Sequence, residues 1–524
     1  MSVSITCYDG VLSIGGNKIL LEDEERKSRL FFDFGLPFAR RYLFFEEYLK
    51  PRVGVGLRDP LRLGLLPPLE GIYRTDLLAA LSAEDRAYIS FSPHHRRLDI
   101  NGVFLSHAHL DHSGYISFLR EDIPVYTTAM TAFIAKVLQD TGQPDFEREV
   151  CYLNLREPNE KGVLCASRRK SYLGRPYVLV DNPALVKHDY WRWSPAQRKG
   201  LEIPSLQPPP ERIGGCPLKV YPVDHSIYGA SACALESSVG WVIYTGDLRL
   251  RGVRGRLSQQ FIESAAALQP VVMLCEGTRI DSEGPEVTEE QVFDAALRVA
   301  QGAQGVILAD FAARNIDRLL IFLRVAKEIG RRLAISPADG FLLEKMRHVD
   351  ASLPDVAEEE AVVIYADVKS APRYWERELR ERYEAKGKLI GAHEVRGSPE
   401  DYILCFSFYD INDLVDIDPQ GGTYIYSSSE AYNEESVLDL WRLRNWLRTF
   451  EMEFIGDPDR KEEHRELHAS GHASGADLLS MIKQIHPQVL IPIHTEKPEL
   501  FARSLTGTGI KVCLPEKGKP IRLP

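Results

Sequence analysis

The feature that most constrains the fold is a run of six residues, His107-Ala108-His109-Leu110-Asp111-His112, which holds four potential metal ligands. A strand-like segment precedes the run, and Ser113-Gly114 follows it where a helix is predicted to begin. A short loop between a strand and a helix can aim all four side chains at one point. Imidazole nitrogens and carboxylate oxygens bind zinc and similar metals. The run therefore predicts a metal-binding loop rather than a group of satisfied polar core residues.

Three more potential ligands directly follow apolar, strand-like segments. His225, Asp247 and His494 come after Lys219–Val223, Trp241–Tyr244 and Val489–Ile493, respectively. Side chains just beyond strand ends face the cleft at the edge of a sheet. Four ligands leave two ions under-coordinated, whereas seven can hold both. The sequence therefore predicts a centre of two divalent ions, a site suited to hydrolysis.

The order of these motifs resembles that of the metallo-β-lactamase fold. The resemblance implies an α/β protein built as an αββα sandwich. It implies that His107, His109 and His225 bind one ion, that Asp111, His112 and His494 bind the other, and that Asp247 bridges both. Zinc is the metal it favours, with manganese as the alternative. Short apolar runs near the N-terminus predict a strand meander at Val3–Ile5, Val11–Ile14, Lys18–Leu21 and Arg29–Phe32.

From about residue 255, strand-like and helix-like segments alternate regularly, which indicates parallel βαβ units. Such a block between Asp247 and His494 is similar to the β-CASP nucleases, which include ribonuclease J and the endonuclease of mRNA 3′-end processing. The resemblance divides the chain into a metallo-β-lactamase domain at 1–254, with an atypical insertion of loops and short helices at about 36–98, an inserted β-CASP domain at 255–462, and the C-terminal part of the first domain at 463–524.

Further motifs of that group concern catalysis. Glu276 follows a strand-like segment, His472 lies in a Ser-Gly-His loop, and the segment 310–318 resembles a ribonuclease J stretch that opens a helix. A histidine kept charged by a carboxylate can protonate a departing oxygen. We therefore expect His472, paired with Glu276, to be a general acid, and Asp111 to act with them in catalysis. A purely structural role for Glu276 stays open.

The loop around His472 contains candidate contacts for a substrate phosphate, because backbone amides and hydroxyls at the start of a helix suit phosphate oxygens. These candidates are His468, Ser470 and Ser474. The two serines could equally be helix caps, and His468 could be a packing residue. A run of arginines at 249, 251, 254 and 256 is either a solvated face or a phosphate track near Asp247.

The resemblance favours a ribonuclease that cleaves RNA phosphodiester bonds with a metal-activated hydroxide. His494 occupies a position where the DNA-repair branch of the family has Val, so RNA is favoured over DNA. The alternative is a metallo-hydrolase of a small ester or lactone, which the net charge of −11 favours. An inactive member of a complex is disfavoured because all seven ligands are retained. Exonuclease and endonuclease action, and the oligomeric state, both stay open.

Bulk features add the remaining expectations. The eight cysteines are scattered without a CxxC pair, which indicates reduced, buried thiols. The longest apolar runs fall short of the roughly 18 residues that span a bilayer, and the N-terminus has no signal-like pattern. We therefore expect a cytoplasmic protein without a membrane partner. Only 30 residues follow His494, so the C-terminal domain of ribonuclease J is not expected.

Overall fold

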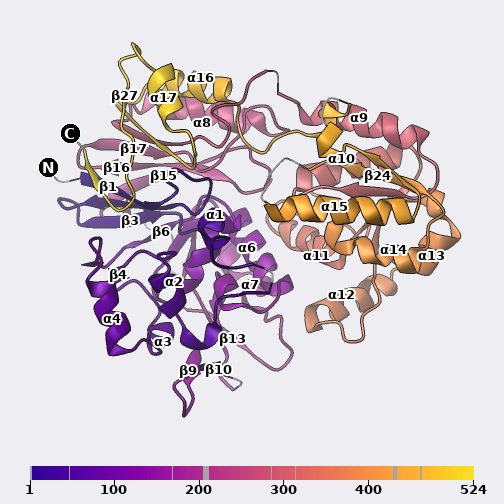
Figure 1. Ribbon diagram of the computed structural model, residues 1–524, viewed down its shortest axis with the longest axis horizontal. Coiled ribbons are helices and arrows are strands. Elements are labelled where there is room, and N and C mark those ends of the chain that lie inside the picture. The colour runs from indigo at the N-terminus through magenta and orange to yellow at the C-terminus, as the bar shows by residue number, and fades with distance from the viewer. Residues whose placement is uncertain are drawn as a thin grey trace.

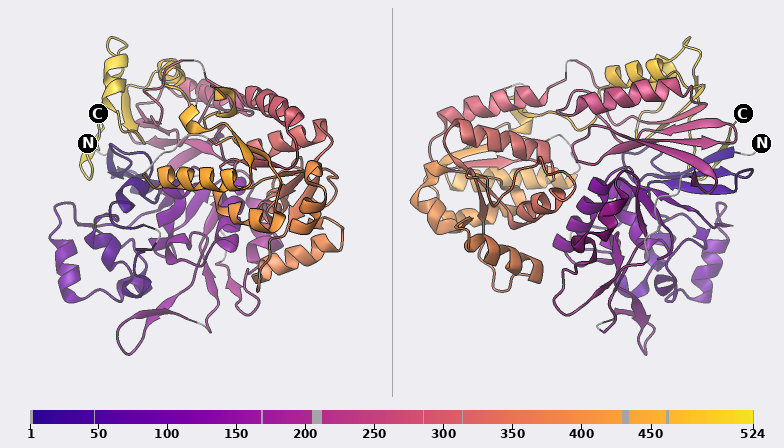
Figure 2. Two further views of the ribbon diagram at one scale, coloured as in Figure 1. Left: turned by 45° about the vertical axis from the view of Figure 1, so that its right-hand side comes forward. Right: turned by 180° about the vertical axis from the view of Figure 1, so that it is seen from behind.

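The computed structural model describes residues 3–46, 48–167, 169–204, 212–284, 286–312, 314–428, 434–460 and 463–523. These residues form a mixed α/β protein of two lobes that lie side by side (Figures 1 and 2). The first lobe contains both termini, and the second contains the alternating block. Within the described ranges, no helix is both long and apolar enough to cross a membrane.

Two seven-stranded sheets build the first lobe. The first has the order β12 (Tyr177–Leu179), β7 (Val125–Thr127), β6 (Gly102–Phe104), β3 (Ser28–Phe32), β2 (Lys18–Asp23), β1 (Val3–Asp9) and β28 (Pro520–Arg522). The second has the order β14 (Arg212–Ile213), β15 (Cys216–Pro222), β16 (Ser231–Ser237), β17 (Gly240–Tyr244), β18 (Val272–Glu276), β26 (Val489–Ile493) and β27 (Lys511–Val512). Antiparallel pairing of β1 with β28 brings the two ends of the chain together.

The two sheets pack face to face. Ile5, Leu21 and Phe104 of the first sheet share one apolar cluster with Val242 and Leu274 of the second. The next residues along the second sheet's strands, such as Ile243, point to its other face. There they pack against α8 (Gly255–Ala267) and α16 (Gly475–Ile485). The strands are therefore buried on both faces, which explains their nearly continuous apolar sequences.

The second lobe is a parallel sheet between helices. Its order is β22 (Leu389–Ile390), β21 (Val362–Tyr365), β20 (Arg332–Ile335), β23 (Tyr402–Leu404), β19 (Ile307–Asp310), β24 (Gly422–Tyr426) and β25 (Met452–Ile455). Its main helices are α9 (Glu289–Gly302), α10 (Ile316–Glu328), α11 (Pro337–Met346), α12 (Tyr374–Glu384) and α15 (Glu434–Thr449). Helix α6 (Ala129–Thr141) of the first lobe packs against α11, so one apolar cluster runs through both lobes.

The segment 36–98 forms short elements on the first lobe. They are α1 (Phe38–Arg41), α2 (Arg58–Arg62), α3 (Thr75–Leu78), α4 (Ala83–Ser90), and the two-residue strands β4 (Leu69–Glu70) and β5 (Arg96–Arg97).

Two local predictions were wrong. Val11–Ile14 is a turn with a single bridge from Ser13 to Thr495, because Gly10, Gly15 and Gly16 have positive φ and reverse the chain. The prediction also placed α8 and β18 in the alternating block. In the structure β18 lies between β17 and β26 of the second sheet, so the block's own sheet begins with β19. Strand β18 pairs in parallel with both neighbours, a pattern that resembles the strands of the block itself.

Candidate metal centre and active site

The run 107–112 begins in the loop after β6 and ends in the short helix α5 (Leu110–Ser113), which contains Asp111 and His112. Asp33, which follows β3 and is completely buried, holds this segment in place through Ser106. The backbone amide and the hydroxyl of Ser106 each donate a 2.7 Å hydrogen bond to the Asp33 carboxylate. The backbone amide of Gly16 donates to the carbonyl of Asp111, and a Cβ on Gly15 would come within 2.8 Å of the Asp111 side chain. The turn at Gly15 and Gly16 therefore allows the backbone there to approach Asp111 closely.

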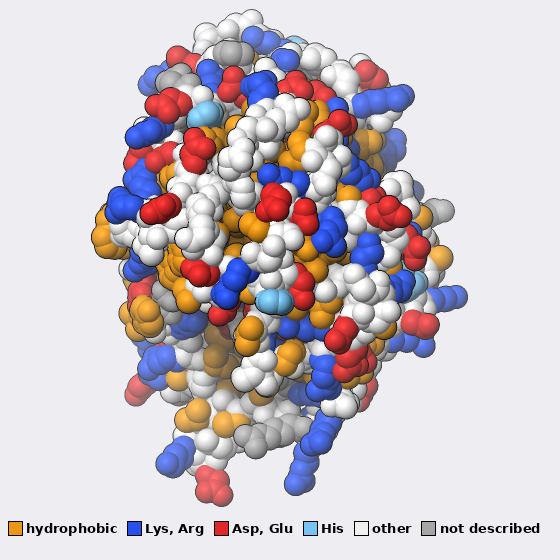
Figure 3. All heavy atoms as spheres, turned by 90° about the vertical axis from the view of Figure 1, so that its right-hand side faces the viewer, with side chains coloured by type: hydrophobic (Ala, Val, Ile, Leu, Met, Phe, Trp, Pro, Cys, Tyr) orange, Lys and Arg blue, Asp and Glu red, His pale blue; other side chains and the backbone are white. Residues whose placement is uncertain are grey.

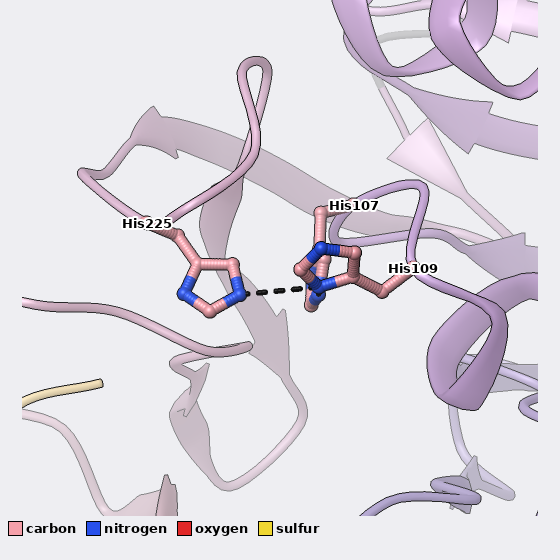
Figure 4. A group of neighbouring side chains, drawn as sticks. All are labelled: His107, His109 and His225. Atoms are coloured by element: carbon pink, nitrogen blue, oxygen red, sulfur yellow. Dashed lines mark hydrogen bonds between the residues drawn. The ribbon is translucent and has the colours of Figure 1, made fainter. Parts of the chain in front are cut away.

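One group of potential ligands consists of His107, His109 and His225, whose nearest nitrogens lie within 4.8 Å of one another. His109 Nδ1 lies 3.1 Å from His107 Nε2 and 3.2 Å from His225 Nε2, as Figure 4 shows for His225. His225 comes from the loop after β15, and its Nδ1 donates to the carbonyl of Gly471 at 2.6 Å. This bond directs the Nε2 lone pair toward the other two rings.

The second group consists of Asp111, His112, Asp247 and His494, again with ligand atoms within 4.8 Å. His112 Nε2 lies 3.0 Å from Asp247 Oδ2, and His494 Nε2 lies 3.2 Å from Asp111 Oδ2. Each imidazole is oriented through its other nitrogen. His112 Nδ1 contacts Asp33 at 2.6 Å, and His494 Nδ1 contacts the Thr278 hydroxyl at 2.9 Å. Such outer contacts are typical of histidines that bind metals.

The electrostatics of the two groups differ. Burial lowers the pKa of His109 to about 4 and those of His107 and His225 well below the usual value, so these rings are neutral at pH 7 with lone pairs to offer. Burial would also lower the pKa of His112, but Asp247, Asp111 and Asp33 raise it well above the usual value. The carboxylates of the second group therefore attract positive charge strongly.

Asp247 provides the clearest test of whether a cation fits. Burial would raise the pKa of this carboxyl, yet His112 and His494 hold it well below its usual range, so it is ionised. Its Oδ1 is buried without a hydrogen-bond partner among the described residues. A buried carboxylate oxygen without a donor is costly unless a cation satisfies it. Together with the neutral imidazoles, this donor set fits divalent metal of the zinc type.

Glu276 and His472 form a pair beside these groups. Glu276 ends β18, is completely buried, and accepts hydrogen bonds from the backbone amides of Leu248 and Thr278, both at 3.1 Å. His472 Nδ1 lies 3.1 and 3.2 Å from the two carboxylate oxygens. Burial would lower the pKa of His472, but Glu276 outweighs it and raises the pKa to about 9. A ligand atom of His472 lies within 4.8 Å of those of His225 and Asp247, so a charged imidazolium faces the centre.

The loop residues proposed for phosphate contact have local partners. Ser474 caps α16 by accepting from the backbone amide of Asp477, and Ser470 accepts from the amide of His472 at 3.1 Å. His468 Nδ1 contacts the carbonyl of Ser428 at 3.0 Å. The capping alternative thus describes Ser474, and Ser470 has the same kind of role in the loop. Gly471 is required because a Cβ there would lie 2.7 Å from the Ser226 hydroxyl.

The arginine run near Asp247 divides into two kinds: Arg251 and Arg256 are exposed, whereas Arg249 and Arg254 bind acidic side chains inside the protein. Arg249 is buried and binds Asp224 at 3.0 Å, Glu289 at 2.6 Å and Asp317 at 2.7 Å. Arg254 shares Asp317, and Arg318 binds Glu289, both at 3.2 Å. Asp224 precedes His225, whereas Glu289 and Asp317 begin α9 and α10. We call these six residues the Arg249 network; it joins the metal centre to the second lobe.

Sequence reasoning missed Asp33, Asp224 and Asp317. Asp33 had a usable signal, because it follows a strand in Asp33-Phe34-Gly35 just as Asp247 follows one. Asp224 and Asp317 had none, since their partners lie on other elements.

The comparisons with known proteins agree with this geometry. Residues 457–515, which include His468, His472 and His494, match the family described as Zn-dependent metallo-hydrolase RNA specificity domain. The chain is 24% identical to ribonuclease J of Mycolicibacterium smegmatis over 82% of this chain and 65% of that protein. It is 22% identical to ribonuclease J of Pyrococcus abyssi over 82% of this chain and 83% of that protein. The predicted resemblance to the ribonuclease J-like nucleases is confirmed.

The chain spans 65%, 51% and 49% of the length of three bacterial ribonucleases J that it matches. Its fold also matches a crystal structure from Enterococcus faecalis V583 described as a protein of unknown function. The TM-score is 0.65 at 24% identity, and the match covers 99% of this chain and 100% of that one. That likeness extends across both lobes and shows the fold alone.

Proposed function

We propose that the protein is a zinc-dependent ribonuclease with two metal ions. The observation that carries the proposal is the convergence of seven ligand side chains on one centre with the His472–Glu276 pair directly beside them. A single metal ion would leave one of the two ligand groups without a metal to bind. The match to an RNA specificity domain and to ribonucleases J supports RNA as the substrate.

In this proposal the fold is an αββα metallo-β-lactamase sandwich with a β-CASP domain inserted between β18 and β26. The face-to-face sheets with α8 and α16 on the outer side support the sandwich. His107, His109 and His225 would hold one ion, Asp111, His112 and His494 the other, and Asp247 would lie between them. Its buried, unpartnered Oδ1 supports that bridging position.

When bound, the ions would activate a water molecule as the nucleophile and stabilise negative charge on the phosphate. Side chains of the protein orient the ligands and supply the proton. Asp33 and Thr278 orient His112 and His494 through their Nδ1 atoms. Because Glu276 receives the Nδ1 hydrogen of His472, the Nε2 hydrogen is left to protonate the departing oxygen. The raised pKa of His472 keeps that proton in place at pH 7.

In this proposal the RNA is recognised by groups close to the metal centre. The net charge is −11, and on the outer face of the second lobe basic and acidic side chains are interspersed (Figure 3). A broad basic surface therefore does not attract RNA to that face, and affinity has to come from groups close to the centre.

The test compares zinc-loaded and manganese-loaded protein on single-stranded RNA with 5′-monophosphate or 5′-hydroxyl ends, on single-stranded DNA of the same sequence, and on a simple aryl ester and a lactone. We expect cleavage of RNA in preference to DNA. Hydrolysis of the ester or lactone without cleavage of either nucleic acid would instead assign the centre to small-molecule hydrolysis.

A further inference from the structure

Arg314 lines a cavity of the second lobe and precedes Asp317 of the Arg249 network by three residues. The cavity has a volume of about 190 Å³ and lies between α6 and the carboxyl edge of the parallel sheet. Its walls include Thr141 of α6, Ser336 before α11, and Arg314 itself, which follows β19. The guanidinium therefore borders space that the protein does not fill.

The backbone at Arg314 is unusual. Its φ is +73°, in the left-handed region that residues other than glycine rarely adopt. Strained backbone of this kind persists where the surroundings impose it, and it is concentrated at functional sites. Here α10 begins directly afterward, with Asn315 as its cap and Asp317 and Arg318 in the Arg249 network. The network thus anchors the start of α10 and forces Arg314 to project from it.

Arg314 also differs from the other arginines around the centre in its partners. Arg249, Arg254 and Arg318 all bind carboxylates. Within the described part of the chain, the Arg314 guanidinium has neither a hydrogen-bond nor an ion-pair partner. Asp339 on the same cavity wall is engaged by the hydroxyl of Ser336 at 2.7 Å.

A second arginine, Arg148 of the first lobe, lies close to the same cavity, because its Nη1 would be 3.6 Å from a Cβ on Gly142, the residue after Thr141 of the cavity wall. Arg148, at the end of a short 3-10 helix (Phe146–Arg148), is exposed, and its side chain likewise has no partner in the described ranges. Burial lowers the pKa of Arg314, the guanidinium of Arg148 lowers it further, and the carboxylate of Asp339 raises it by less. Asp339 therefore offsets the repulsion between the two guanidinium groups only in part. An anion from outside the chain would relieve their repulsion.

Arg314 is close to the metal centre through the start of α10. Arg254 donates to the carbonyl of the proposed ligand His225 at 2.9 Å and to Asp317, three residues beyond Arg314, at 3.2 Å. An anion held by Arg314 would therefore lie near the first ligand group.

We propose that Arg314 and Arg148 clamp one phosphate of the RNA strand and thereby position the neighbouring phosphodiester at the metal centre. The inference rests on the proposed ribonuclease function. Guanidinium groups suit this role because their fork of donors matches phosphate oxygens in pairs. With one arginine on each lobe, the phosphate would also bridge the two lobes.

The experiment measures RNA cleavage by metal-loaded Arg314→Met, Arg148→Met and the double variant over a range of salt concentrations. We expect KM to rise roughly tenfold or more for Arg314→Met, as befits loss of a charge-assisted bond. The slope of log kcat/KM against log salt should flatten by about 0.7 for each lost contact. The Arg314→Lys variant should recover part of the loss, since it keeps the charge.

The matched control is Arg324→Met on α10, the helix that follows Arg314; the exposed Arg324 side chain pairs with Glu290, and this variant should cleave as the wild type does. Bound metal and thermal midpoint should be unchanged in every variant. If the wild type cleaves RNA and Arg314→Met has the same KM and salt slope, the clamp is wrong. A wild type that cleaves no RNA overturns the proposed function itself, whatever the arginine variants do.

Discussion

The metal centre and the Arg249 network are two buried clusters of charged groups that lie next to each other and are built in opposite ways. In the network, three carboxylates meet three arginines, so the chain supplies both signs of charge. In the metal centre, the ion-pair partners of Asp33, Asp111 and Asp247 among the described residues are imidazoles, and the histidines of the first group are neutral at pH 7.

This difference distinguishes a cluster that stabilises the fold from a cluster that binds ions. Buried charges are tolerated when they are paired, and breaking one member of a pair leaves the rest uncompensated. A cluster that compensates itself therefore holds the fold together, whereas a cluster that does not requires something from solution. By this criterion the network is a structural connection, and the centre is a binding site for cations.

Replacing Asp247 should have the largest effect on the centre. Asp247→Ala removes the carboxylate placed between the two ligand groups, so we expect cleavage to fall to background and the bound zinc to fall by about one equivalent. Elemental analysis of the purified variant beside an RNA cleavage assay would measure both. An Asp247→Ala protein with the same metal content as the wild type would remove the bridging assignment.

Replacing His472 should leave the centre intact and remove the proton donor. Loss of a general acid reduces the rate by about 10²–10⁴-fold, so we expect His472→Ala to lower kcat by that amount while metal content is unchanged. A variant that binds metal normally and cleaves at the full rate would exclude the general-acid role.

The Glu276→Gln variant tests the same proton donor by changing the partner of His472. Glu276 raises the pKa of His472, and the donor works only below that pKa, where it is protonated. Removing the negative charge should therefore move the alkaline limb of the kcat profile to lower pH. An unmoved limb would mean that another group limits the rate at high pH.

Breaking the network should affect stability rather than chemistry. Arg249→Met leaves Asp224, Glu289 and Asp317 with too few cations, and loss of one partner from a buried pair costs about 3–5 kcal/mol. Urea unfolding followed by circular dichroism would measure the loss. Arg324→Met breaks an exposed pair, worth about 0.2–1 kcal/mol, and is the control. Equal stability of the two variants would contradict the structural role of the network.

The smallest expected effect concerns Asp33, which contacts His112 directly and His107 through the Ser106 hydroxyl. Changing the outer partner of a metal-binding histidine weakens metal affinity by about 10–100-fold. Asp33→Asn should therefore show that loss in a zinc competition titration with a chelator, with cleavage restored at high zinc. Unchanged affinity would show that His112 is oriented by its other contacts.

The parts of the centre that could be predicted are those whose geometry is local. The four potential ligands in the run 107–112 are so close in sequence that a short loop brings them together. Strand-end positions identify His225, Asp247 and His494, because strands that run in the same direction end at a common edge of the sheet. The Ser-Gly-His loop predicts the pairing of His472 with Glu276 only through its resemblance to a family. The alternation of strands and helices from about residue 255 likewise predicts the second lobe, although it wrongly includes α8 and β18.

What could not be predicted depends on distant contacts. The partners of Arg249 come from three elements, and no spacing in the sequence relates them. Strand β18 resembles the strands of the second lobe in its sequence, and only its pairing with β17 and β26 assigns it to the second sheet. Val11–Ile14 has a strand-like composition, but flanking glycines turn it toward Asp111.

The route of the chain through the second sheet has a consequence for synthesis. Strand β26, which delivers His494, inserts beside β18 only after the whole second lobe has been made. Between residues 247 and 494, nearly half of its 524-residue length, the growing polypeptide thus carries six of the seven ligands without a finished centre. If the protein cleaves RNA, this order keeps the nascent chain harmless to the message that encodes it until nearly the last strand has folded.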